Sequence, residues 1–323
     1  MMTSMLQTGE TPAGSRALNP AEDFHPGGDY FAARRPAFGE SSLDLVIGPL
    51  RMRLEGLSEP QAMRLEARFH PFVGAPDHGP DLTIAMRRAA VVGFLKPPAP
   101  GASEIYRLES RPEGGRVAIW SYEFAGWVDT GQGCAELDLA EAGGALFDRG
   151  LENFLRVMTA SFILRRGGLL LHGSGVVRDG RAYVFFGPSG AGKTTVTRLS
   201  PRDLVLSDDL TLIVRGEGDR PMAAGIPFGM AHHRVPETNG SFPIAALHRL
   251  VQSPAVRRTE IPYSQAVAEV ASSLPFVMQE TGQAMLAMDT VAALLRAVPV
   301  YRLEFRNDDS FWGVVADRPD GAR

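Results

Sequence analysis

A glycine-rich segment that begins at Gly187 restricts the fold of this chain more than any other feature. It reads Gly-Pro-Ser-Gly-Ala-Gly-Lys-Thr and matches the phosphate-binding loop pattern G-x-x-x-x-G-K-[ST] at every fixed position. The apolar run before it, Tyr-Val-Phe-Phe at residues 183–186, is typical of a buried strand. Glycines suit the loop because side chains would block a close approach of the backbone and because some positions need a positive φ. The segment therefore predicts a strand, a loop and a helix, in that order.

The loop predicts a nucleotide polyphosphate as its ligand. Its backbone N–H groups and the positive end of the following helix can converge on phosphate. Lys193 would reach the β- and γ-phosphates, and the Thr194 hydroxyl would bind Mg²⁺. The alternative is an ordinary glycine-rich turn, but the chain has only two lysines, Lys96 and Lys193, and otherwise uses arginine as its cation. The predicted nucleotide-binding residues are Gly187, Pro188, Ser189, Gly190, Ala191, Gly192, Lys193, Thr194 and Thr195.

A hairpin is expected immediately before the loop. Asp179-Gly180 lies between two apolar runs and is a strong signal for a type I′ turn. The strand that enters the loop should therefore pair antiparallel with its predecessor, residues 169–177. In most proteins with such a loop the neighbouring strands are parallel and are reached through helices, so the hairpin distinguishes this chain.

Two aspartates follow the loop at a short distance. Pro201 should end the helix, and an apolar run then leads into Asp208 and Asp209. The 15 positions between Lys193 and Asp208 leave room for one helix and one strand. A carboxylate pair at a strand end is typical of a Mg²⁺-binding element. The alternative is a simple turn after the strand, which would have the same sequence pattern. We assign the metal to Thr194 and Asp208 and proton transfer to the second aspartate, but the sequence leaves open which aspartate has which role.

Four elements are expected to converge on one phosphate site: His172, the glycine-rich loop, the aspartate pair and a tight loop at residues 225–229. His172 is a candidate catalytic residue, and a core histidine bonded to the backbone is the alternative. The adjacent pair His232-His233 is not expected to bind metal, because neighbouring residues on a strand point to opposite faces.

The rest of the chain is expected to form two further parts. Residues 1–40 read as a flexible tail, and residues 41–143 as a small α+β domain of unknown role. In this domain Ser58 and Gln61 form a capping box that should start a helix. A helix over residues 144–166, with one apolar stripe, should join it to a phosphate-binding domain over residues 144–323. The expected fold class is α/β with a mixed sheet.

Composition and charge exclude several classes of protein. The chain is 44% hydrophobic and 22% charged, and its net charge of −4 gives no general attraction to nucleic acid or anionic lipid. Cys134 is the only cysteine, so an intrachain disulfide cannot form. The sequence shows neither a signal-peptide core nor an apolar stretch of membrane-spanning length. We therefore expect a cytoplasmic protein without nucleic-acid or membrane partners, and a homo-oligomer is among the options.

Taken together, these motifs resemble those of a known family. His172-Gly173, the hairpin, the loop from Gly187 to Thr194 and the run Ser207-Asp208-Asp209 resemble the kinase core of HPr kinase/phosphorylase. That family shares its core with ATP-dependent phosphoenolpyruvate carboxykinases, and the likeness covers about residues 168–230. The resemblance implies that the loop binds ATP, that His172 opens the hairpin, and that the aspartates bind metal and supply the catalytic carboxylate.

The resulting hypothesis is an ATP- and Mg²⁺-dependent kinase that phosphorylates a hydroxyl group, with Asp208, Asp209, His172 and Lys193 as catalytic residues. A serine or threonine of a peptide or protein is the expected acceptor, docked by Arg51, Arg53 and Arg87 of the first domain and by residues 225–252. One alternative is a nucleotide-binding regulatory or scaffold protein with little turnover. Another is a carboxykinase-like enzyme for a small acid, for which Arg257-Arg258 is the candidate anion-binding pair.

Overall fold

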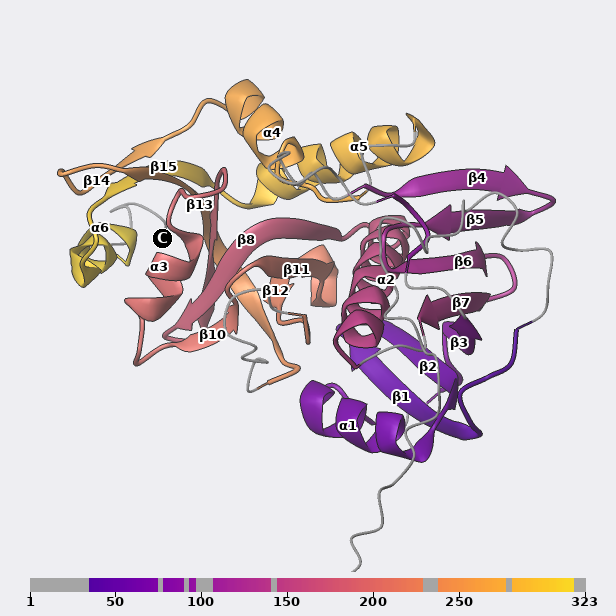
Figure 1. Ribbon diagram of the computed structural model, residues 1–323. Helices are drawn as coiled ribbons and strands as arrows, with labels where there is room; N and C mark the ends of the chain where they lie inside the picture. Colours follow the sequence, from indigo (N-terminus) through magenta and orange to yellow (C-terminus); the bar gives the residue numbers. More distant parts are fainter. Residues whose placement is uncertain are drawn as a thin grey trace, which may run out of the picture.

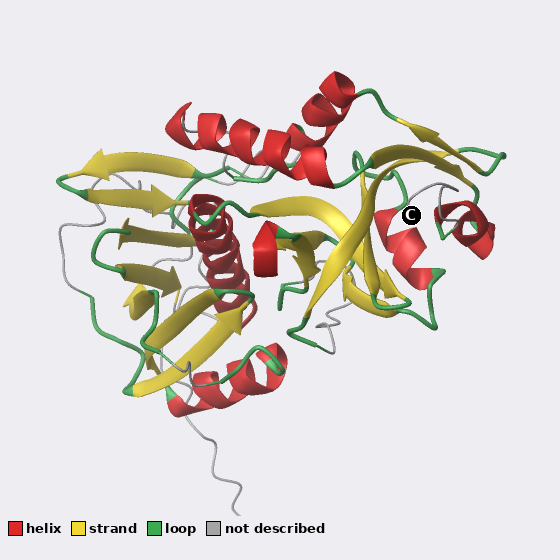
Figure 2. Cartoon of the chain, turned by 180° about the vertical axis from the view of Figure 1, so that it is seen from behind, coloured by secondary structure: helices red, strands yellow, loops and turns green. Residues whose placement is uncertain are grey.

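The computed structural model describes residues 35–74, 78–89, 93–96, 107–140, 144–228, 238–276 and 281–316. Its strands form two sheets, which lie on either side of a long helix, α2 (Gly144–Arg165) (Figure 1). Further helices lie along the outside of the molecule (Figure 2). Both sheets contain parallel and antiparallel pairs, so the expected mixed α/β architecture is confirmed.

The first sheet has the strand order β1-β2-β3-β7-β6-β5-β4. The pairs β2–β3 and β3–β7 are parallel, and the others are antiparallel. A parallel pair needs a crossover, which α1 (Glu59–Phe69) supplies between β2 and β3. The helix begins with the expected capping box, in which Ser58 and Gln61 bond reciprocally. The strands are β1 (Ser41–Ile47), β2 (Leu50–Leu57), β3 (Leu82–Ala89), β4 (Glu109–Glu113), β5 (Arg116–Trp120), β6 (Phe124–Asp129) and β7 (Cys134–Ala140).

The apolar residues at 105–108 of the sequence favour a strand there, but the structure has strand β4 immediately after them. Residues 105 and 106 lie outside the described residues, and Arg107 and Leu108 precede the strand. Its sequence, Glu-Ser-Arg-Pro-Glu, is mostly exposed and lacks apolar alternation, which hides it from pattern analysis. It forms the edge of the sheet, where a proline is tolerated because its missing N–H is not needed by a neighbour.

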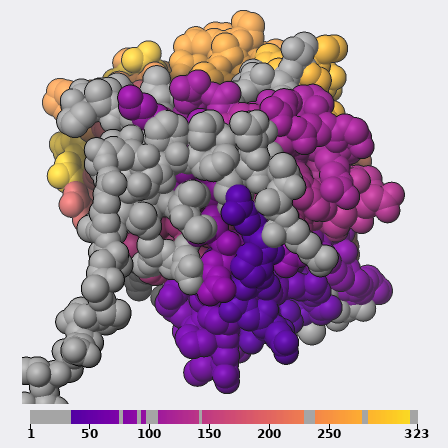
Figure 3. All heavy atoms as spheres, turned by 45° about the vertical axis from the view of Figure 1, so that its right-hand side comes forward, coloured from indigo at the N-terminus to yellow at the C-terminus, as the bar shows by residue number. Residues whose placement is uncertain are grey.

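Helix α2 buries the apolar stripe expected from the sequence, and from Gly150 to Leu164 it is enclosed on its other sides as well, with only Ser161 partly exposed. It contacts β2, β6 and β7 on one side and β8 (Leu169–Arg178) and α5 (Thr281–Ala297) on the other. Its buried residues therefore include polar ones, and Arg156 pairs with Glu152 one turn away at 3.6 Å. Gly167, with φ of +71°, ends the segment and turns the chain into β8. Figure 3 shows the molecule from the side of the first sheet, with the C-terminal helices in orange above it.

The second sheet depends on two long strands that change partners along their length. The first half of β8 pairs with β11, and its second half pairs with β9 and β10. Strand β13 pairs in turn with β12, β9 and β15, so the pairs close a circuit β8–β11–β12–β13–β9. The remaining strands are β9 (Arg181–Phe186), β10 (Leu204–Ser207), β11 (Leu210–Arg215), β12 (Pro221–Ala224), β13 (Ser241–Gln252), β14 (Arg257–Glu260) and β15 (Val300–Phe305).

The hairpin between β8 and β9 forms as the sequence predicts. Asp179 and Gly180 have φ angles of 53° and 71°, as a type I′ turn requires, and the two strands pair antiparallel. On its other edge β9 pairs with β13 in parallel. The helix after the loop, α3 (Lys193–Arg198), has one to two turns and ends before Pro201, as expected.

Helices cover the second sheet on both faces. Helix α4 (Tyr263–Ala271) packs against α5, while α3 and α6 (Trp312–Val315) enclose a separate aromatic cluster that includes Phe185, Phe305 and Phe311. Among the described residues, no helix has both the length and the apolar character that a membrane crossing needs.

His248 of β13 lies at the margin of this aromatic cluster and is fully buried. Its ring stacks between Phe185 and Tyr301, with centroids 5.3 and 5.8 Å away. Among the described residues neither ring nitrogen has a hydrogen-bond partner. Burial, and to a lesser degree the charge of Arg258, lowers the pKa of His248 from 6.5 to about 3. The imidazole is therefore neutral in the folded protein.

We predict that His248 makes the protein sensitive to acid. Because its pKa is lower in the folded than in the unfolded state, the unfolded state binds the proton more readily and stability falls as pH decreases from about 6.5 towards 3. At pH 5 the loss is about 2 kcal/mol. We expect the free energy of unfolding of His248→Phe, measured with denaturant, to fall between pH 7.5 and pH 5 by about this amount less than that of the wild type. The control His78→Phe changes an exposed histidine and should behave like wild type, whereas equal losses in all three proteins would contradict the prediction.

Candidate functional site

The glycine-rich loop joins β9 to α3 and leaves its tip exposed. Gly187, Gly190 and Gly192 have φ angles of 149°, 77° and 108°, which other residues rarely adopt. A Cβ on Gly192 would lie 2.5 Å from the Phe305 ring, while the space around Gly190 is open. The Gln252 side chain at the end of β13 donates to the Gly190 carbonyl at 2.7 Å. The glycines are therefore required by backbone conformation and, at Gly192, by the packing of α3 on β15.

Lys193 folds back over the start of the loop. Its ammonium donates to the carbonyls of Gly187 at 2.9 Å and Pro188 at 3.2 Å, and the residue is buried. Burial lowers the pKa of Lys193, and the nearby Asp209 carboxylate partly opposes this shift. A cation held in this way, next to the exposed residues Ser189 and Gly190, is suited to bind an anion.

His172 and Asp209 come together from two strands. Leu210 of β11 lies opposite His172 of β8, and the preceding Asp209 places its Oδ1 3.3 Å from the imidazole Nδ1. The Ser207 hydroxyl accepts from the backbone N–H of Asp209 and of Leu210, which fixes the link between β10 and β11. With 39% of its side chain exposed, His172 is not the core histidine of the alternative interpretation.

Burial and the charge of Lys193 favour a neutral His172 imidazole. Burial has the largest effect and lowers its pKa, the Lys193 ammonium lowers it further, and the Asp209 carboxylate raises it. The net direction of this shift is downward, which favours the neutral imidazole. Three of the four catalytic residues expected from the sequence, His172, Lys193 and Asp209, therefore lie together.

Asp208 and Asp209 interrupt what is nearly one strand. Strands β10 and β11 both pair with β8, on the same edge, and the two aspartates lie between them. The expected position at a strand end is correct, since β10 ends at Ser207. Asp208 is half-buried in this link.

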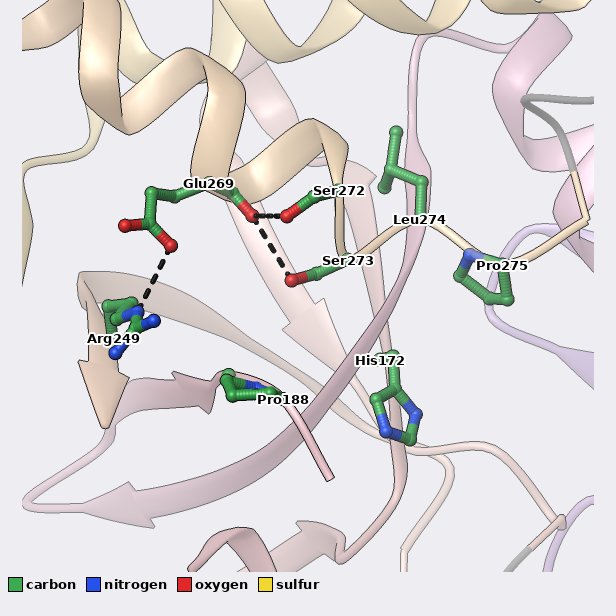
Figure 4. A pocket seen from close by; sticks show the side chains of 9 residues that line it. His172, Pro188, Arg249, Glu269, Ser272, Ser273, Leu274 and Pro275 are labelled. Atoms are coloured by element: carbon green, nitrogen blue, oxygen red, sulfur yellow. Dashed lines mark hydrogen bonds and ion pairs between the residues drawn. The ribbon is translucent and has the colours of Figure 1, made fainter. Parts of the chain in front are cut away.

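A cavity of about 440 Å³ opens beside the start of the loop. Two of its lining residues, Arg249 of β13 and Glu269 of α4, were not among the site residues predicted from the sequence. The guanidinium Nε donates to Glu269 Oε2 at 3.0 Å (Figure 4). The only signal in the sequence is Arg249 itself, a charged residue within the largely apolar stretch at residues 242–251. The cavity is lined by His172, Gly187, Pro188, Arg249, Glu269, Ser272, Ser273, Leu274 and Pro275.

The loop at residues 225–229 does not line this cavity. Ile226 and Phe228 are buried, and Phe228 packs edge-on against Phe69 of α1 with ring centroids 6.1 Å apart. The expectation that this loop joins the site is wrong for its described residues, because their apolar side chains fill the core. Gly229, His232 and His233 lie outside the described residues.

Two of the three arginines of the first domain that were expected to dock the acceptor, and both arginines of the candidate anion-binding pair, make contacts within the fold. Arg53 forms two hydrogen bonds to Asp44, and Arg87 bonds to Glu136 at 3.0 Å. Both pairs join neighbouring strands of the first sheet. On the second sheet, Arg257 pairs with Glu304 at 2.7 Å, and Arg258 donates to the Val315 carbonyl and lies over the Tyr301 ring.

The residues around the loop provide oxygen donors for a metal ion. Among the described residues no three His, Cys, Asp or Glu side chains gather closely enough to form a complete metal site. Mg²⁺ bound to a nucleotide needs only one or two carboxylates beside the phosphates and water. Thr194 and the aspartate pair fit that requirement in kind.

We predict that alanine has different effects at two glycines of the loop. At Gly190 it meets only the strain of a positive φ, about 1 kcal/mol or slightly more. At Gly192 it also collides with Phe305, so Gly192→Ala should destabilise the protein by a further 1–3 kcal/mol, roughly. Denaturant unfolding of both variants measures the difference, and equal losses would mean that Phe305 does not restrict the loop.

Comparisons with known proteins identify one family. No curated protein matches the chain. Residues 153–317, just over half of the chain, match the family described as SynChlorMet cassette protein ScmC. The matched segment begins in α2 and contains the whole second sheet together with the loop and the residues that converge on it. This chain therefore belongs to the SynChlorMet cassette protein ScmC family.

Proposed function

We propose that this protein is an ATP- and Mg²⁺-dependent kinase with an HPr-kinase-like core, which phosphorylates a hydroxyl group. The observation that carries the proposal is the convergence of His172, Lys193 and Asp209 at the start of the glycine-rich loop. These residues come from separate segments, and local structure alone would not bring them together. The antiparallel hairpin that leads into the loop supports the same core.

The loop and Lys193 would bind the nucleotide. Backbone N–H groups of the loop would face the phosphates, and the Lys193 ammonium would exchange the carbonyls of Gly187 and Pro188 for the β- and γ-phosphates. Thr194 and Asp208 would hold Mg²⁺, which neutralises phosphate charge when bound. The pattern is that of phosphoryl transfer, which depends mainly on positioning and electrostatics.

Asp209 would accept the proton of the acceptor hydroxyl. As the acceptor oxygen forms its bond to the γ-phosphorus, the bond from that phosphorus to the β–γ bridging oxygen breaks, and ADP leaves with the bonding electrons. The released proton passes to the Asp209 carboxylate. The neutral His172 imidazole can donate from Nδ1 to Asp209 and orient it.

The size and lining of the cavity suit a hydroxyl side chain on a short segment of polypeptide. Its volume of about 440 Å³ lies at the small end of ligand sites, and its walls are polar on the Arg249–Glu269 side. A serine or threonine of a peptide or protein is therefore the acceptor that we propose. A carboxykinase-like role has less support, because Arg257 and Arg258 bond within the fold.

Lys193→Ala tests the nucleotide site. ATP with Mg²⁺ at 100 times its Kd should stabilise the wild type by about 2.7 kcal/mol, and the variant should lose most of this effect because the ammonium serves phosphate. Thermal unfolding with and without ATP measures it. Lys96→Ala removes the only other lysine, which is exposed, and should leave the stabilisation unchanged. Equal stabilisation of all three proteins would exclude this site, and binding without transfer would favour a regulatory role.

The two aspartates should differ in their roles. Asp209→Asn should keep ATP binding and slow transfer by about 10²- to 10⁴-fold, because the amide cannot accept the proton. Asp208→Asn should instead raise the Mg²⁺ concentration needed for half-maximal activity. Transfer of labelled phosphate at varied Mg²⁺ distinguishes the two effects. Full activity in both variants would remove the aspartate pair from the mechanism.

A further inference from the structure

We propose that Arg249 is a further catalytic residue of this site, which leaves Glu269 and binds the γ-phosphate of the nucleotide during transfer. Without nucleotide, Arg249 is paired with Glu269. The inference rests on the proposed kinase function and adds to it a residue that neither the loop motif nor the family match assigns.

The sheet places Arg249 next to the loop. Strand β13 runs parallel to β9, and Arg249 is the register partner of Phe186, which immediately precedes Gly187. The Arg249 side chain lines the cavity together with Gly187, Pro188 and His172. In Figure 4 Arg249 and His172 lie on either side of Pro188. Arg249 is thus fixed by backbone pairing at the entrance of the loop.

The cavity lies at the end of the loop where the γ-phosphate is expected. The Lys193 ammonium rests on the carbonyls of Gly187 and Pro188, and the lysine of such loops binds the β- and γ-phosphates. The same two residues form one wall of the cavity. A side chain that lies in the cavity is therefore closer to the expected position of the terminal phosphate than to the rest of the nucleotide.

Beside Lys193 and the metal ion, Arg249 is the cationic side chain that could add charge at the moving phosphoryl group. It is the only arginine or lysine among the described residues that line the cavity. The lowered pKa of His172 keeps the imidazole neutral, so it does not contribute charge. Charge on the equatorial oxygens of the transferred group is stabilised by fixed cations, and a guanidinium can bind two of these oxygens at once.

The bond to Glu269 is one that Arg249 can exchange. Its Nε donates to Glu269 Oε2 at 3.0 Å and its Nη1 to the Leu250 carbonyl at 3.2 Å, while within the described residues Nη2 has no hydrogen-bond partner. The side chains of Arg249 and Glu269 are 25% and 27% exposed. Partly exposed ion pairs contribute little to stability, so a phosphate can replace the carboxylate at small cost.

The backbone of Glu269 is anchored at the end of α4. The hydroxyls of Ser272 and Ser273 donate to its carbonyl at 2.8 and 3.1 Å, and the His172 backbone N–H donates to the Ser273 carbonyl at 2.8 Å. The end of α4 is therefore tied to β8. In this proposal the arginine side chain moves, and the Glu269 carboxylate, which also accepts from Gln265 Nε2 at 3.5 Å, competes with phosphate for it.

The test compares ADP with a non-hydrolysable ATP analogue, both with Mg²⁺, on the full chain. Arg249→Met should keep the thermal stabilisation by ADP, lose the additional stabilisation by the ATP analogue, and transfer phosphate at least about 100-fold more slowly. Glu269→Gln should bind the ATP analogue more tightly than wild type, because its amide releases the arginine. Arg257→Met, which removes an arginine paired with Glu304, should match wild type in both measurements.

The outcomes separate this inference from the proposed function. A wild type that neither nucleotide stabilises overturns both. A wild type that binds and transfers, with an Arg249→Met variant that equals it, overturns the role of Arg249 alone. Equal loss of ADP and ATP-analogue binding in Arg249→Met would make Arg249 a support of the loop and also overturn the inference. If Arg249→Met does not fold, Glu269→Gln still tests the inference: weaker binding of the ATP analogue by this variant than by wild type would overturn it.

Discussion

The pairing of β9 on both of its edges is the constraint on which the site depends. On one edge the type I′ hairpin fixes β8 antiparallel to it, and this places His172 one residue before the paired segment begins. On the other edge the parallel ladder to β13 places Arg249 beside the start of the loop. Strand β8 then carries Asp209 through its pairing with β11. A shift of one residue in either ladder would turn these side chains to the opposite face of the sheet.

Electrostatics and packing act together around the loop. Burial lowers the pKa of both Lys193 and His172, and the Asp209 carboxylate partly opposes both shifts. The carbonyls of Gly187 and Pro188 accept hydrogen bonds from the Lys193 ammonium in the same place. The aromatic cluster on the other side of the loop leaves room for no side chain at Gly192. The loop is thus held by apolar contacts on one side, while the charged side chains of Arg249 and Glu269 line the cavity beside its start.

Local features of the fold could be predicted from the sequence, and those that need distant partners could not. The Ser58 capping box, the Asp179-Gly180 turn and the short helix before Pro201 depend on neighbours within a few positions. Arg249 and Glu269 become site residues only through the parallel pairing of β13 and the position of α4, for which the sequence carries no local signal. The loop at residues 225–228 looked like part of the site because of its glycine and proline, but Phe228 finds its partner in α1.

The two sheets are coupled through α2, although the family match covers only one of them. Phe124 of β6 packs edge-on against Phe154 of α2, with centroids 5.5 Å apart, and one apolar core extends from β1 to β15. The match begins inside α2, so its boundary is one of sequence similarity and not of packing. Because α2 turns at Gly167 directly into the strand that carries His172, the first sheet fixes the starting point of β8. Its physical contribution to the site is therefore to bury the far side of this helix and so to hold β8 in place.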